Sequence, residues 1–140
     1  MELTLATQED FEQFLPIKEE FFREYNISKK SEKFILEEFK EYLLKGAIVL
    51  AIENREIIGY LAGEIEDTPY EKFGYISEVF VKKEYRGKGV STKLKDIFLE
   101  FLRKKGITIC RIEVNPDNPA QEVYKKWGFK IDKYRMSIKF

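Results

Sequence analysis

A glycine-containing turn near the middle of the chain has the residues of an anion-binding site. The strand-like stretch Val79-Phe80-Val81 leads into Arg86-Gly87-Lys88-Gly89, after which helical apolar spacing begins. Free backbone N–H groups at a helix start attract phosphate, and glycine lets it approach closely. The turn matches neither a Walker loop nor a dinucleotide-binding fingerprint, because Gly89 follows Lys88 and Thr92 replaces the third glycine. The residues therefore predict either a phosphate cradle or a tight turn that binds nothing.

The same turn resembles the Arg-x-x-Gly-x-Gly/Ala signature of the GNAT superfamily of acyl-CoA-dependent N-acyltransferases, with Ser91 at the final small position. A second segment, from Glu113 to Phe129, is similar to the closing block of that family, which contains Asn, Ala, Tyr and Gly-Phe. The two blocks occur in the family's order, and the resemblance covers nearly the whole chain. It implies a single GNAT N-acetyltransferase domain over residues 1–140, with acetyl-CoA as cosubstrate and no metal.

The resemblance also implies roles for individual residues. Val79 to Val81 would pair with the pantetheine arm of coenzyme A like an added strand, and the N–H of Val81 would meet the oxyanion. Tyr124 would be the general acid that protonates the departing thiolate. Asn118 would either contact the cofactor or only cap the following helix. The expected cofactor-binding residues are Val79, Phe80, Val81, Arg86, Gly87, Lys88, Gly89, Val90, Ser91, Thr92, Asn118 and Tyr124.

Two carboxylates are candidates for the general base. An alkyl amine with a pKa of about 10.4 is mostly protonated at neutral pH, so a carboxylate acting directly or through water can serve as the base that takes up its proton. Glu113 ends the strand before the Tyr124 helix, and Glu78 precedes the phosphate turn. A solvated or salt-bridged strand residue is an alternative for each. Alternation places Glu78 and Phe80 on one strand face, and a bulge would reverse part of this pattern.

These roles predict acetyl transfer from acetyl-CoA to a primary amine by direct attack in a ternary complex. The alternative is a catalytically silent coenzyme A-binding regulatory or interaction domain. The acceptor would be a small-molecule or peptide amine. An acidic loop containing Glu64, Glu66, Asp67 and Glu71 would either attract a cationic amine or simply be solvated. The resemblance also allows a homodimer formed through the tail strands.

Composition excludes several other functions. The chain has 140 residues, no histidine, and 25 basic against 25 acidic residues. The absence of histidine removes Ser-His-Asp triads and His-ligated metal sites, and zero net charge gives no general attraction to nucleic acid or anionic lipid. One cysteine allows no internal disulfide and suits a cytoplasmic location. No signal peptide or membrane-length apolar stretch is visible.

Hydrophobic periodicity predicts an α/β (α+β) fold. The resemblance specifies a mixed central sheet of six to seven strands, about four helices and a splayed parallel strand pair. Thr7 and Ser31 are expected to cap the first two helices, with a kink at Pro16, and Asn118 with Gln121 is expected to form a capping box on the last. The predicted strands are 3–5, 47–52, 57–65, 73–82, 108–114 and one or two in the tail 128–140.

Overall fold

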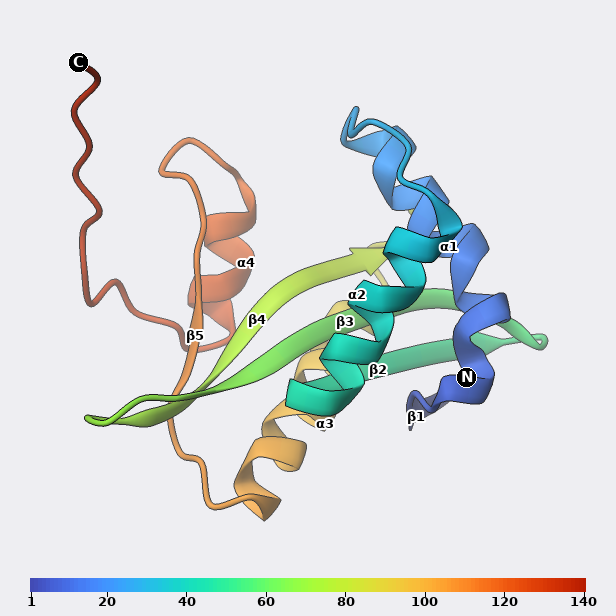
Figure 1. Cartoon of the computed structure of the whole chain (residues 1–140), viewed down its shortest axis with the longest axis horizontal. Helices are drawn as coiled ribbons and strands as arrows, with labels where there is room; N and C mark the ends of the chain where they lie inside the picture. The colour runs from blue at the N-terminus through green and yellow to red at the C-terminus, as the bar shows by residue number, and fades with distance from the viewer.

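The central sheet is built from apolar segments joined by short connections. The computed structural model describes residues 1–140 and contains five strands in the order β1-β2-β3-β4-β5 (Figure 1). The first four strands are antiparallel neighbours, and β5 lies parallel to β4. The strands are β1 (Glu2–Leu5), β2 (Gly46–Glu53), β3 (Glu56–Asp67), β4 (Lys72–Val81) and β5 (Cys110–Ile112).

Four α-helices connect and cover these strands. They are α1 (Phe11–Glu24), α2 (Glu32–Lys45), α3 (Val90–Lys104) and α4 (Ala120–Lys126). The predicted cap at Ser31 is present, since its hydroxyl accepts a hydrogen bond from the N–H of Phe34 at 3.1 Å. Thr7 caps a short 3₁₀ turn that precedes α1, and α1 continues through Pro16. None of these helices combines the length and the apolar composition that a membrane-spanning helix requires.

The predicted hairpin between β2 and β3 is confirmed. Its two connecting residues, Asn54 and Arg55, have φ angles of 51° and 64°. Positive φ at both positions matches the right-handed twist of the strands, which explains why a tight turn forms without an Asn-Gly pair. The predicted parallel arrangement of the strands on either side of α3 is also confirmed.

Helices cover both faces of the sheet, so its middle strands are buried on both sides. One core cluster lies between the sheet and helices α1 and α2, and includes Phe14, Phe39, Tyr60 and Phe80. The second lies on the opposite face against α3, and includes Leu61, Ile76, Leu94 and Phe98. This packing explains the nearly continuous apolar sequence of β2 and β3.

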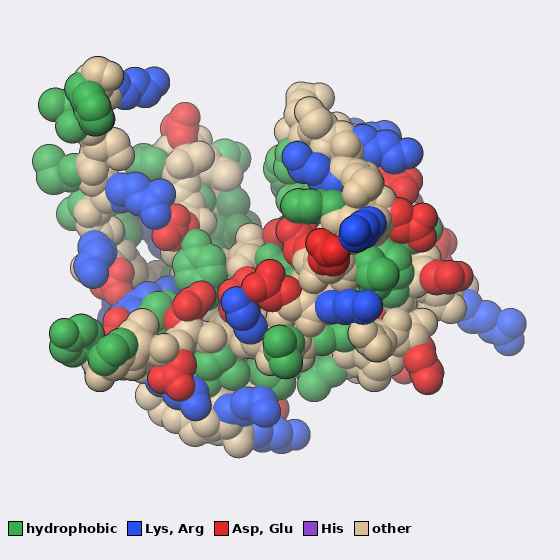
Figure 2. Space-filling model, viewed as in Figure 1, with side chains coloured by type: hydrophobic (Ala, Val, Ile, Leu, Met, Phe, Trp, Pro, Cys, Tyr) green, Lys and Arg blue, Asp and Glu red, His purple; other side chains and the backbone are tan.

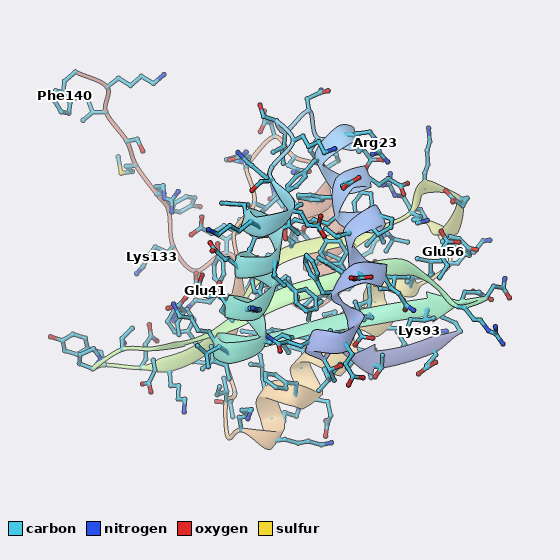
Figure 3. The ribbon with its side chains drawn as sticks, turned by 45° about the vertical axis from the view of Figure 1, so that its right-hand side comes forward. Arg23, Glu41, Glu56, Lys93, Lys133 and Phe140 are labelled. Atoms are coloured by element: carbon cyan, nitrogen blue, oxygen red, sulfur yellow. The ribbon has the colours of Figure 1, made fainter.

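The prediction of six to seven strands is wrong, because the tail forms no strand and the fifth strand contains only Cys110–Ile112. An alternating sequence becomes a strand only where a neighbouring edge accepts its hydrogen bonds, and β5 pairs over only three residues. The tail extends away from the sheet, with Phe140 at its far end (Figure 3). Its large apolar side chains are exposed, as Met136 at 92% illustrates.

Candidate active site

The turn between β4 and α3 has the geometry of an anion cradle. Gly87 and Gly89 adopt φ angles of 75° and 80°, and a Cβ atom built on either would meet no atom within 4 Å. The backbone N–H groups of Gly87–Thr92 donate to no protein acceptor. The next backbone N–H, that of Lys93, donates to the Gly89 carbonyl at 3.1 Å. The first turn of α3 contains no acidic residue. Unpaired N–H groups beside an open surface are suited to a phosphate.

Arg86 does not direct its guanidinium freely toward this cradle. Its Nε donates to the Val81 carbonyl at 2.8 Å, and its Nη2 donates to the Glu24 carboxylate at 2.5 Å. The guanidinium carbon also lies 5.4 Å from the centre of the Phe80 ring. Arg86 therefore fastens the end of β4 to the end of α1, which fixes where the turn begins.

The end of β4 has an edge next to the cradle that pairs with no other strand. β5 pairs with β4 only along Gly74–Ile76, so the strands separate beyond Ile76. The backbone N–H of Lys82 donates to the Ile58 carbonyl at 2.9 Å, which continues the pairing of β4 with β3. Because backbone groups alternate between the two edges of a strand, those of Phe80 point toward β3 and those of Val79 and Val81 toward the open side. An extended ligand can hydrogen-bond there as an additional strand.

Helix α4 is fastened beside the cradle by its aromatic residues. The indole Nε1 of Trp127 donates to the Thr92 hydroxyl at 3.1 Å, which links α4 to the first turn of α3. Asn118 accepts a hydrogen bond from the N–H of Ala120 at 2.9 Å, so its capping role is observed. The side-chain amide of Gln121 donates to the Pro116 carbonyl at 3.0 Å instead of closing the predicted capping box.

Tyr124 is half-buried on the same short helix. Its ring centre lies 5.5 Å from that of Trp127 and 6.4 Å from that of Phe129. Burial, with a smaller contribution from the nearby Tyr25 hydroxyl, raises the pKa of Tyr124 above its ordinary value. The hydroxyl is therefore protonated at neutral pH and can donate a proton to a nearby anion.

A β-bulge orients Glu78. The β3–β4 pairing passes from Ala62 opposite Glu78 to Gly63 opposite Ile76, which leaves Ser77 as the extra residue. The bulge sends Ile76 into the α3 core while Glu78 contacts Lys18 of α1 on the opposite face. Both carboxylate oxygens of Glu78 contact the Lys18 ammonium, the Oε2 at 2.7 Å. Burial raises the pKa of Glu78, while the charge and hydrogen bonds of Lys18 lower it.

Glu113 lies in a different environment. Its side chain is 59% exposed, and both of its oxygens accept hydrogen bonds from Arg135 at 3.2 Å. Burial and the charge of Glu113 raise the pKa of the nearby Tyr75 hydroxyl. The two candidate bases therefore belong to separate clusters, with Glu78 buried against α1 and α2 and Glu113 at the surface.

The ion-pair partner of Glu78, Lys18, did not emerge from the sequence analysis. Lys18 of α1 and Glu38 of α2 form an ion pair at 3.0 Å, and the Lys18 side chain is only 2% exposed. A sequence signal does exist, since Lys18 lies four residues from both Phe14 and Phe22, on the apolar stripe of its helix. A charged residue on such a stripe indicates a buried partner.

The acidic loop is partly neutralised. Glu71 accepts two hydrogen bonds from Arg111, at 2.7 and 2.9 Å. Burial and the neighbouring Glu66 raise the pKa of Glu64. Figure 2 shows acidic side chains gathered beside α2 on this face.

Comparisons with known proteins agree with this fold. The model of the acetyltransferase (GNAT) family matches residues 11–129, and the chain belongs to that family. An uncharacterised N-acetyltransferase of Methanocaldococcus jannaschii is 26% identical over 133 residues; the match spans 89% of this chain and 58% of that protein, so less than two thirds of the relative is covered.

Two solved structures illustrate the similarity of fold. A predicted acetyltransferase from Clostridium acetobutylicum, solved with acetyl-CoA, is 20% identical with a TM-score of 0.82; the match covers 99% of this chain and 95% of that one. An aminoglycoside acetyltransferase from an uncultured soil sample, in complex with sisomicin, is 14% identical with a TM-score of 0.81, covering 99% and 94% of the two chains. At these identities the structures show the shared fold.

Proposed function

We propose that this chain transfers an acetyl group from acetyl-CoA to a primary amine by direct attack in a ternary complex. The observation that carries the proposal is the row of unpaired N–H groups at Gly87–Thr92. This row is continuous with the edge of β4 at Val79 and Val81, which pairs with no strand and where Arg86 bonds the Val81 carbonyl. When bound, acetyl-CoA would supply an activated acetyl thioester. The N–H groups of the cradle would hold its pyrophosphate, and the β4 edge would hold its pantetheine arm.

The N–H of Val81 would stabilise the negative charge that develops on the acetyl oxygen. A donor fixed in a strand needs no reorganisation as charge appears, which makes such groups effective in catalysis. The Arg86 hydrogen bond to the Val81 carbonyl fixes this peptide segment. Phe80, with its ring buried and its backbone turned toward β3, would support the strand from behind.

Glu78 would take up the proton of the acceptor amine, directly or through water. Its burial makes its carboxylate more basic than an exposed one, which favours proton uptake near neutral pH. Glu113 is the alternative base, and its exposed position at the surface makes it the weaker candidate. Tyr124 would donate a proton to the leaving thiolate, which would require its hydroxyl to lie beside the sulfur.

The acceptor would be a small-molecule or peptide amine. The sisomicin-bound acetyltransferase supports a small cationic amine. Negative charge from Glu38 and Glu64 near the base would attract either cation. A homodimer and a cytoplasmic location remain predictions from the sequence.

The test compares the wild-type chain with Tyr124→Phe. Thiol release from acetyl-CoA in the presence of an amine should fall about 100-fold in the variant, because general acid catalysis contributes roughly 10²–10⁴-fold. Calorimetric affinity for acetyl-CoA should remain close to wild type. Equal turnover in both proteins would exclude Tyr124 as the acid, and binding without any turnover would support the silent-domain alternative.

A further inference from the structure

Lys18 occupies a buried ammonium site beside the proposed base. Its Nζ contacts Glu78, lies 3.0 Å from Glu38, and is 4.9 and 5.1 Å from the centres of the Phe21 and Phe22 rings. The side chain comes from α1, whereas its two carboxylate partners come from β4 and α2. Two carboxylates and two aromatic faces enclose one charge.

We propose that Lys18 is a positioning residue that keeps the Glu78 carboxylate ionised and oriented for proton transfer. This inference rests on the proposed function, in which Glu78 is the base. Orientation follows from the contacts, because both Glu78 oxygens are held by the same ammonium group. The bulge at Ser77 directs the Glu78 side chain toward α1, and the contacts with Lys18 fix the position of its carboxylate.

The ionised state follows from the balance of charge around a nearly enclosed group. The Glu78 side chain is 14% exposed, and a carboxylate without a partner in such surroundings takes up a proton. The titratable groups facing it are Lys18 from α1, Glu38 and Tyr42 from α2, and Tyr60 from β3. Lys18 is the only cation among them.

The other facing groups cannot replace Lys18. Burial raises the pKa of both Tyr42 and Tyr60, so neither hydroxyl carries charge at neutral pH. Glu38 opposes ionisation of Glu78, because like charges in proximity favour the protonated form of one of them. Removing the charge of Lys18 and removing the charge of Glu38 should therefore shift the titration of Glu78 in opposite directions.

The experiment measures kcat/KM against pH for wild type, Lys18→Met, Lys18→Arg and Glu38→Gln. An opposite charge at contact distance shifts a carboxyl pKa by roughly 1–3 units. The acidic limb of Lys18→Met should therefore move upward by at least about one pH unit, which lowers activity about tenfold on that limb. Glu38→Gln should move the limb downward by less, because Glu38 is 34% exposed. Lys18→Arg retains the charge and should keep the wild-type limb.

Lys45→Met is the matched control. Lys45 forms an exposed ion pair with Glu41 at 2.7 Å, so its loss should leave the profile unchanged. The inference would be overturned if the pH profile of Lys18→Met coincided with that of Lys45→Met. It would also be overturned if Lys18→Met and Glu38→Gln moved the acidic limb in the same direction. A purely structural Lys18 would change unfolding temperature without moving the limb, which would also overturn it.

Carbon-13 NMR of glutamate carboxyls gives a readout independent of turnover. The Glu78 resonance is identified by its loss in Glu78→Gln, and its titration should shift upward in Lys18→Met and downward in Glu38→Gln. If Lys18→Met does not fold, the other two variants test the inference. It predicts a downward shift of the Glu78 titration in Glu38→Gln and an unchanged titration in Lys18→Arg. A chain with these shifts but no acetyl transfer would refute the proposed function alone, whereas an active chain without them would refute the role of Lys18.

Discussion

Replacing Gly89 with alanine is expected to weaken acetyl-CoA binding through loss of the cradle geometry. Gly89 has φ 80° and lies immediately before α3, among the unpaired N–H groups. Gly106 is a matched control, because it lies just after the same helix, has φ 77°, and also has open space where an alanine methyl group would lie. The two substitutions share backbone strain and differ in their distance from the proposed phosphate site.

The expected magnitudes follow from this comparison. A side chain in the left-handed region costs about 1–2 kcal/mol, so both variants should lose similar stability. Only the methyl group at Gly89 would also meet the phosphate. Hydrogen bonds to charged groups contribute about 1.5–3 kcal/mol each, so losing one would weaken binding roughly 10- to 100-fold.

Isothermal titration with acetyl-CoA, with unfolding temperatures measured in parallel, separates these two effects. Gly89→Ala should bind at least about tenfold more weakly than Gly106→Ala at equal stability. Equal affinity in the two variants would refute the assignment of this turn as the phosphate site.

Three further predictions concern packing and reactivity. Burial raises the pKa of Cys110 to about 12, so the native thiol should react with a disulfide reagent at pH 8 far more slowly than the unfolded chain; equal rates would contradict the burial. Thr92→Val removes the acceptor of the Trp127 indole, and should change the emission of this sole tryptophan while costing about 1 kcal/mol in urea unfolding; an unchanged spectrum would show that α4 does not depend on this bond. Gly63→Ala would place a Cβ 2.3 Å from Phe98 and should cost about 1–3 kcal/mol, more than Gly59→Ala, whose nearest contact is 3.2 Å; equal urea midpoints would contradict this packing.

The sequence predicted the elements that local patterns determine. The caps at Ser31 and Asn118 and the left-handed Gly128 after α4 depend on neighbouring residues, and all three are present. The cradle glycines also have the positive φ that a tight strand-to-helix turn requires. These features need no information about distant contacts.

Features that depend on distant residues were harder to predict. The tail has an alternating pattern, but a strand also needs a partner edge, and β5 pairs over only three residues. The face to which Glu78 points depends on the bulge at Ser77, which exists only in the pairing with β3. The partnership of Lys18 with Glu78 joins residues sixty positions apart, and only tertiary packing brings them together.

The most direct test of the central claim is acetyl transfer itself. The wild-type chain is incubated with acetyl-CoA and a panel of primary amines, including polycationic small molecules and short peptides, while thiol release and acetylated products are followed by mass spectrometry. We predict release of free coenzyme A that depends on the amine, together with a product that has gained one acetyl group. Release no faster than without protein, for every amine in the panel, would contradict the proposed activity.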